Sequence, residues 1–170
     1  MLINILLFII LLTCVITDLK SRKIYNHVIF PSLVLALLFH FFTGGFSGLG
    51  HSLLGLLTGF AILLIPYLMG GMGAGDVKLL AVIGAIKGVS FVLAAAVYMA
   101  IIGAAIGLAI MLFRRGAFQR MRVLVYSLCG MKYGVKIFPS QESLQATYPY
   151  GVAIAGGTMM AFFVNGVQFL

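Results

Sequence analysis

The sequence predicts an all-α, polytopic membrane protein with six transmembrane helices. Of its 170 residues, 63% are hydrophobic and 8% are charged, and the mean hydropathy is +1.20. Soluble domains carry about 45–50% apolar and about 25% charged residues, so a chain this short cannot hide so much apolar surface in a water-soluble fold. The apolar residues form long runs, whereas a transmembrane β-barrel shows short alternating segments. We therefore expect residues 1–170 to form a single membrane-embedded domain.

Six apolar runs supply the predicted helices. The first lacks the basic segment and the cleavage site of a signal peptide, so we expect it to be retained. The fourth and fifth come from one stretch that would measure about 55 Å as a single helix, against a hydrocarbon core of about 30 Å. This stretch must break, and Lys87-Gly88 is the predicted break, which leaves a short fourth helix. In chain order, the runs are 2–17, 28–42, 52–69, 77–86, 89–113 and 150–169.

The basic residues orient the predicted helices in the membrane. The net charge of +8 would suit a nucleic-acid partner, but the basic residues stand between apolar runs, which is the positive-inside pattern of membrane proteins. With six crossings, ten of the 11 Lys and Arg residues fall on one side, and only Lys87 falls on the other. This split predicts cytoplasmic basic loops, both termini outside, and no nucleic-acid partner.

The one long loop, residues 114–147, is predicted to be cytoplasmic. Its first part, 114–132, interleaves Arg and Lys with apolar residues. That composition is typical of an amphipathic helix on an anionic membrane surface, and a solvated basic loop is the alternative.

Glycines recur at a spacing of four residues in the predicted helices. Small residues at this spacing allow two helices to approach closely in a membrane. The pairs are Gly55/Gly59, Gly84/Gly88 and Gly103/Gly107.

Only three residues of the chain are acidic, and all three fall on the predicted cytoplasmic side. They are Asp18, Asp76 and Glu142. From Asp76 to Lys87 a helix spans about 18 Å, against a core of about 30 Å. If Lys87 reaches the outer interface, Asp76 lies below the inner surface. An ionisable group at that depth predicts a functional site.

The two aspartates have structural alternatives when each is taken alone. Asp18 suits a counter-ion for Lys20 or Arg22, and Asp76 suits the N-cap of the fourth helix. Taken together, they converge on one side of a bundle that has almost no other acids. Two nearby carboxyl groups cannot both ionise cheaply, so one keeps a proton and the pair can activate a water as base and acid. This predicts aspartyl protease chemistry, which needs no metal and no organic cofactor.

Other chemistries fit the sequence poorly. His27 is predicted inside, but His40 and His51 fall on the outer side, away from both aspartates, which argues against a Ser/His/Asp site or a zinc site. The glycine-rich run 71–75 lies between apolar runs instead of after a strand, so it is not a dinucleotide-binding fingerprint. We expect its glycines to let backbone and substrate approach closely beside Asp76, helped by access to positive φ at Gly75.

Three pieces of the sequence resemble the type IV prepilin peptidases, a family of GxGD intramembrane aspartyl proteases. The first is DLKSRKI at residues 18–24, and the second is GAGDVKLLA at 73–81. The third, YPYGVA at 148–153, resembles the Pro-aromatic-Gly motif of the family. The family usually has Pro where this sequence has Tyr25, which bears on loop shape and substrate preference.

The resemblance implies a prepilin leader peptidase of the bacterial inner membrane. Such an enzyme cuts after a Gly, between the leader and the hydrophobic helix of a prepilin or pseudopilin, at the cytoplasmic face. We expect the protein to lack the N-terminal methylating segment of long family members, as in the short form of tight-adherence (Flp) pilus systems. A small proton- or cation-coupled transporter using the same aspartates is the alternative, with a structural subunit third. The resemblance implies Asp18 and Asp76 as the catalytic pair, with Gly73, Gly75, Lys78, Pro149 and Gly151 around them.

Overall fold

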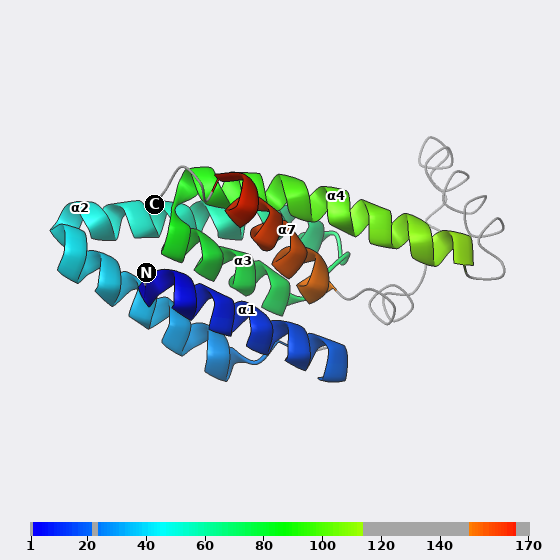
Figure 1. The fold of residues 1–170 in the computed structure, drawn as a ribbon, viewed down its shortest axis with the longest axis horizontal. Coiled ribbons are helices and arrows are strands. Elements are labelled where there is room, and N and C mark those ends of the chain that lie inside the picture. Colours follow the sequence, from blue (N-terminus) through cyan, green and yellow to red (C-terminus); the bar gives the residue numbers. More distant parts are fainter. Residues whose placement is uncertain (1, 22–23, 114–149, 166–170) are drawn as a thin grey trace. The chain divides into compact units, whose positions relative to one another are not determined.

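Every regular element that the structure describes is a helix, which confirms the all-α fold class. The computed structural model describes residues 2–21, 24–113 and 150–165, and no strand occurs among them. Figure 1 shows the helices, which are α1 (Leu2–Ser21), α2 (Asn26–Leu68), α3 (Ala74–Lys87), α4 (Val89–Phe113) and α7 (Tyr150–Asn165).

Three of these helices, α1, α2 and α4, are long and apolar enough to cross a membrane. The helices α3 and α7 are shorter, with 14 and 16 residues. The protein is thus a membrane protein by length and composition of its helices, while the count of six spans stays a prediction. The amphipathic helix predicted in the loop 114–147 lies outside the described residues.

The chain divides into two compact units. The first consists of residues 1–103 and 149–170, and it holds α1, α2, α3, α7 and the first part of α4. The second consists of residues 104–148, of which the structure describes only the end of α4.

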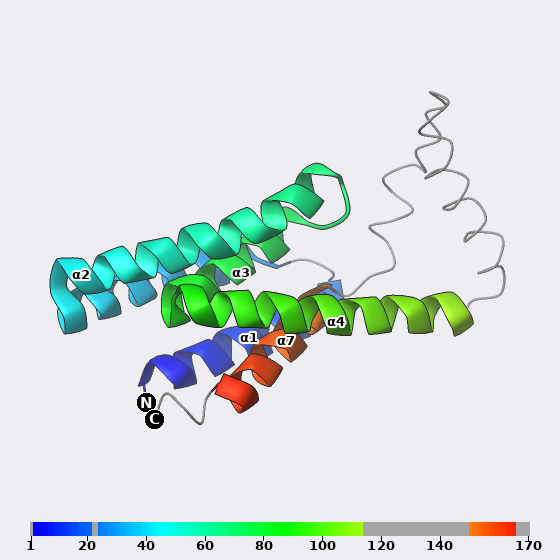
Figure 2. The same ribbon diagram turned by 90° about the horizontal axis from the view of Figure 1, so that it is seen from above.

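The helix α2 contains both the second and the third predicted runs. Its 43 residues would extend about 65 Å if the helix were straight. At Gly45 the backbone turns to φ 58 and ψ −145, which glycine adopts without strain, and Figures 1 and 2 show α2 folding back on itself. Gly48 then packs against the carbonyl of His40, where a Cβ atom would overlap. Residues 43–51, between the two predicted runs, therefore do not form a loop. They are helical before and after Gly45.

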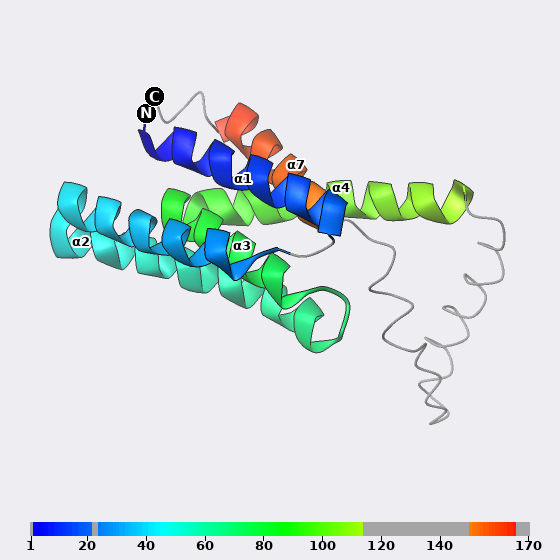
Figure 3. The ribbon, with the colours of Figure 1, turned by 90° about the horizontal axis from the view of Figure 1, so that it is seen from below.

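The short helix α3 is the most buried element. Ten of its 14 residues are buried, and it contacts α1, α2 and α7. The helices α1 and α7 also contact each other and lie side by side in Figures 2 and 3. A helix that is apolar all round belongs in a core, so α3 forms the centre of this unit.

Two of the predicted glycine pairs produce close helix packing. A Cβ at Gly55 would overlap the carbonyl of Gly84, and a Cβ at Gly59 would lie 2.9 Å from the carbonyl carbon of Leu80. The backbone of α2 therefore lies directly on the backbone of α3, as small residues permit. At Gly103, by contrast, an added Cβ would make only an ordinary contact, 3.8 Å from the Cβ of Ala153.

The C-terminal end of α3, which is the far end from Asp76, is fixed by side chains from both halves of α2. The Ser52 hydroxyl donates to the carbonyl of Ala85 at 2.7 Å, and the Nε2 atom of His40 lies 3.0 Å from the carbonyl oxygen of Ile86. The last carbonyls of a helix have no partner within the helix, so these contacts satisfy groups that burial would otherwise make costly. Gly88, with φ 85, then ends the helix and confirms the predicted break.

Candidate active site

Asp18 is held at the end of α1 by the start of α7. Its side chain is only 8% exposed, and the backbone N–H of Gly151 donates to its Oδ2 atom at 2.9 Å. N–H groups in the first turn of a helix have no partner within the helix and carry its positive end, so they favour a carboxylate. A Cβ at Gly151 would lie 2.7 Å from the same oxygen. Only glycine at this position lets α7 approach Asp18 so closely.

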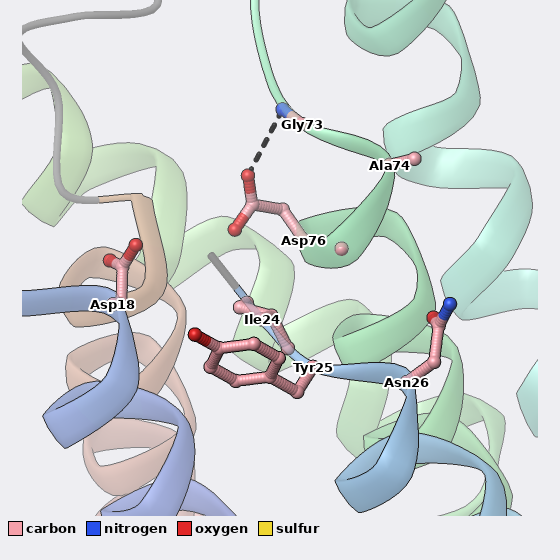
Figure 4. A pocket seen from close by; sticks show the side chains of 8 residues that line it. Asp18, Ile24, Tyr25, Asn26, Gly73, Ala74 and Asp76 are labelled. Atoms are coloured by element: carbon pink, nitrogen blue, oxygen red, sulfur yellow. Dashed lines mark hydrogen bonds between the residues drawn. The ribbon is translucent and has the colours of Figure 1, made fainter. Parts of the chain in front are cut away.

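Asp76 is fixed by the first turn of α3. Its side chain is 7% exposed, and its Oδ2 atom accepts the N–H of Gly73 at 3.1 Å (Figure 4). In return, the N–H of Asp76 donates to the carbonyl of Gly73 at 3.1 Å. Gly73 is the N-cap of α3 and Asp76 lies three residues later, so the N-cap alternative for Asp76 is wrong. The bond from Gly73 thus holds one oxygen of the carboxyl group. Figure 4 shows the other oxygen directed into the pocket.

The two aspartates share one pocket of about 360 Å³. Asp18 comes from α1 and Asp76 from α3, and the segment before α2 closes the pocket beneath them (Figure 4). Because both carboxyl groups are buried yet border the same cavity, a bound molecule can contact both. The residues that line the pocket are Asp18, Ile24, Tyr25, Asn26, Gly73, Ala74, Gly75 and Asp76.

Gly75 makes a close contact in the pocket, and its φ is not positive. It is the second residue of α3, and the glycines with positive φ in the described part of the chain are Gly45, Gly70 and Gly88. A Cβ at Gly75 would lie 2.9 Å from the Cβ of Ile24. The expectation of positive φ at Gly75 is therefore wrong, and the close approach at this glycine is to the wall of the pocket itself.

Lys78 supports the pocket without lining it. Its Nζ atom donates to the side-chain oxygen of Asn26 at 3.0 Å and lies 5.6 Å from the ring centre of Phe30. These contacts tie α3 to the start of α2, where Asn26 lines the pocket.

Ile24, Asn26 and Ala74 line the pocket without having been predicted from the sequence. A signal for the first two was present, since Ile24 ends the Asp18 motif and Asn26 follows it, in the loop between the first two apolar runs. That loop falls on the same side of the membrane as Asp76. Pro149, which was predicted to lie near the pair, is outside the described residues.

Two histidines of α2, His40 and His51, lie at the end of α3 that is away from this pocket. His40 contacts the carbonyl of Ile86 at the opposite end of α3, and His51 lies against Gly88. In the described ranges, no three His, Cys, Asp or Glu side chains are grouped so that they could hold a metal ion. The groups of this pocket that are best suited to proton transfer are its two carboxyl groups.

Comparison with known protein families identifies the family of this chain. The model of the type IV leader peptidase family matches residues 5–108, which is more than half of the chain and includes both aspartates. Gly151 lies beyond the matched residues. No curated protein and no solved structure gives a significant match. The chain therefore belongs to the type IV leader peptidase family, as its sequence motifs predicted.

Proposed function

We propose that this peptidase is an aspartyl protease that removes the leader from type IV prepilins or pseudopilins. Membership of the family supports a leader peptidase activity. The observation that carries the choice of mechanism is the shared pocket, in which Asp18 and Asp76 are both buried and each accepts a backbone N–H. Pairs of carboxyl groups in such sites share one proton and serve as base and acid.

The proposed reaction needs one ionised and one protonated carboxyl group. The ionised group takes a proton from a water molecule, whose oxygen attacks the scissile carbonyl carbon. The protonated group donates its proton to the carbonyl oxygen, which gives a neutral tetrahedral intermediate. The C–N bond then breaks as the leaving nitrogen takes a proton from the first carboxyl group, and the second takes a proton back from the intermediate. The pair returns to its starting state without a cofactor.

The backbone bonds give each carboxyl group a fixed orientation during this cycle. The N–H of Gly151 holds one oxygen of Asp18, and the N–H of Gly73 holds one oxygen of Asp76. Hydrogen bonds of this kind favour the ionised form of a carboxyl group, which offsets part of the cost of burial. With their orientations fixed in this way, both carboxyl groups are positioned to exchange protons with a water and a peptide at the pocket, as general acid–base catalysis requires.

The wall beside Asp76 suits a substrate with little side-chain bulk at the cleaved bond. It includes Gly73 and Ala74, whose small size lets an extended backbone approach Asp76 closely. This supports cleavage after a Gly, which the sequence resemblance implies for prepilins. A small Flp-like prepilin is the substrate that we propose to test first.

We further propose that the pocket faces the cytoplasm, in a bacterial inner membrane. The distribution of basic residues along the sequence supports this orientation. Ser21 and Ser47 are exposed and stand at the two predicted sides. A cysteine at Ser21 should react with an impermeant thiol reagent only after cell lysis, and a cysteine at Ser47 in intact spheroplasts. Labelling of the Ser21 variant in intact spheroplasts would contradict the orientation.

The proposed reaction is tested with the purified protein and a Flp-like prepilin in detergent. We expect a single cut after the leader Gly, located by mass spectrometry of both products. A prepilin carrying Val in place of that Gly is the matched control, and we expect it to be cut at least about tenfold more slowly. Intact wild-type prepilin, or cleavage at another bond, would contradict the proposal. A transporter using the same carboxyl groups would leave the prepilin intact.

A further inference from the structure

Tyr25 stands at the entrance of the pocket with its backbone fixed. It is the N-cap of α2 and has extended torsions, φ −81 and ψ 134. Its carbonyl accepts the N–H of Val28 at 3.1 Å and the N–H of Ile29 at 3.4 Å. Because its torsions are not helical, the Tyr25 side chain leaves α2 and lies in the wall of the pocket.

Burial separates Tyr25 from the two aspartates. Its side chain is 45% exposed, whereas Asp18 and Asp76 are 8% and 7% exposed. The carboxyl groups thus form the buried floor, and the tyrosine ring lies nearer the opening. Figure 4 shows the hydroxyl end of the ring directed to the side of the pocket where Asp18 and Asp76 lie.

Both neighbours of Tyr25 are held against α3. Ile24 packs against Gly75 so closely that an added Cβ would lie 2.9 Å from the Cβ of Ile24. Asn26 accepts the bond from Lys78 at 3.0 Å. The position of Tyr25 is therefore set from both sides, unlike that of a tyrosine on a solvated loop.

A peptide that enters this pocket must bury its own backbone groups. A buried N–H or C=O without a partner costs more than a hydrogen bond gains, so a cleavable peptide needs donors at the wall. The tyrosine hydroxyl can donate and accept, and the ring offers an apolar surface beside it. We propose that Tyr25 binds the substrate and determines specificity, with its hydroxyl donating to a backbone carbonyl next to the scissile bond and its ring covering the adjoining side chain.

This inference rests on the proposed leader peptidase activity and is tested in the same assay. The variants are Tyr25→Phe, which removes only the hydroxyl, and Tyr25→Ala, which also removes the ring. Tyr67→Phe is the matched control, because Tyr67 lies near the end of α2 with a similar exposure, 39%, and does not line the pocket.

For Tyr25→Phe we expect KM to rise about 3- to 10-fold, the effect of one lost hydrogen bond, with kcat within about twofold. Tyr25→Ala should raise KM by about 30-fold, because the ring contact is lost as well. Tyr67→Phe should match the wild type in both constants. Binding of a labelled prepilin peptide to Asp76→Asn should weaken in the same order when the Tyr25 changes are added, which reports on binding without turnover.

Unchanged KM and unchanged peptide binding in both Tyr25 variants would overturn the inference. An equal rise in KM for Tyr67→Phe would also overturn it, as would a drop in thermal stability with no change in KM. In each of these cases a wild-type protein that cleaves prepilin leaves the proposed function standing. If the wild type cleaves no prepilin, the proposed function fails and the role of Tyr25 fails with it.

Discussion

The two ends of α3 differ in what surrounds their polar groups. At the far end, Ser52 and His40 reach the carbonyls of Ala85 and Ile86, and Gly84 lies directly on α2. At the near end, Asp76 shares a pocket of about 360 Å³ with Asp18. One short helix thus has a closely packed end and an end beside a cavity.

This difference shows how a small membrane protein can hold a reactive pair in place. Burying a carboxyl group costs stability, and such sites are kept where chemistry requires them. The close packing of the far end, through Gly55 and Gly84, fixes α3 against α2. The position of Asp76 is then determined by α3 itself, although the near end of this helix leaves space around the carboxyl group. Substitutions at the far end should therefore affect folding, and substitutions at the near end should affect turnover.

The largest effect outside the aspartates is expected at Gly151. An added Cβ would lie 2.7 Å from Oδ2 of Asp18, so Gly151→Ala must displace the carboxyl group or the start of α7. A shift of about 1 Å in a catalytic group costs about 100-fold in rate, which is the loss in kcat that we expect. Gly103→Ala is the control, since its Cβ would lie 3.8 Å from Ala153, and its kcat should stay within about twofold. Equal rates for Gly151→Ala and the wild type would show that this contact does not position Asp18.

A second pair of variants compares the two ends of the helix directly. Gly75→Val should lower kcat by about 10- to 100-fold at a normal protein level, because it displaces Ile24 from the pocket wall. Gly55→Val should instead lower the amount of folded protein, because its side chain would overlap the backbone at Gly84. Turnover per folded molecule and thermal stability in detergent separate the two outcomes. If Gly75→Val cleaves at the wild-type rate, the pocket wall tolerates its displacement.

A smaller effect is expected from the contact that supports the wall. Lys78→Met removes the bond to Asn26 and should lower kcat/KM by about 3- to 10-fold, as for one hydrogen bond. Lys78→Arg should keep most of the wild-type kcat/KM, because arginine still offers a hydrogen-bond donor to Asn26. Lys87→Met is the control at the other end of α3, where the ammonium lies 4.8 Å from the ring centre of Phe162. Its kcat/KM should stay near the wild-type value. A loss at Lys87 as large as that at Lys78 would mean that the contact at Asn26 has no special role.

Much of this fold was predictable because helix ends and glycines leave clear signals. The break at Gly88 followed from the length of one apolar run against the thickness of a membrane. The meeting of Asp18 and Asp76 followed from two helix ends on the same predicted side. The reversal of the chain between the second and third runs was predicted, but not its form as a single turn at Gly45 within α2, because the sequence around it is rich in glycine and typical of a loop. There the packing of Gly48 against His40 keeps both sides of the turn helical.

The wall of the pocket was harder to predict than its floor. Asn26 acquires its place through a bond to Lys78, which is distant in the sequence. Gly75 was identified as important, but for its torsions instead of its contact with Ile24. Contacts of this kind depend on how α2 and α3 pack, and no local pattern encodes them.

The central claim is that Asp18 and Asp76 act as one catalytic unit. Its most direct test measures single-turnover cleavage of a Flp-like prepilin by Asp18→Asn, Asp76→Asn and the double variant, with Glu142→Gln as the control outside the sequence motifs. Residues that act as a unit are strongly non-additive, so each single variant should lose at least about 1,000-fold and the double variant should lose no more. Glu142→Gln should cleave within about twofold of the wild type. Turnover within about tenfold of the wild type by either single Asp variant, or a double variant that loses the product of the two single effects, would contradict the account.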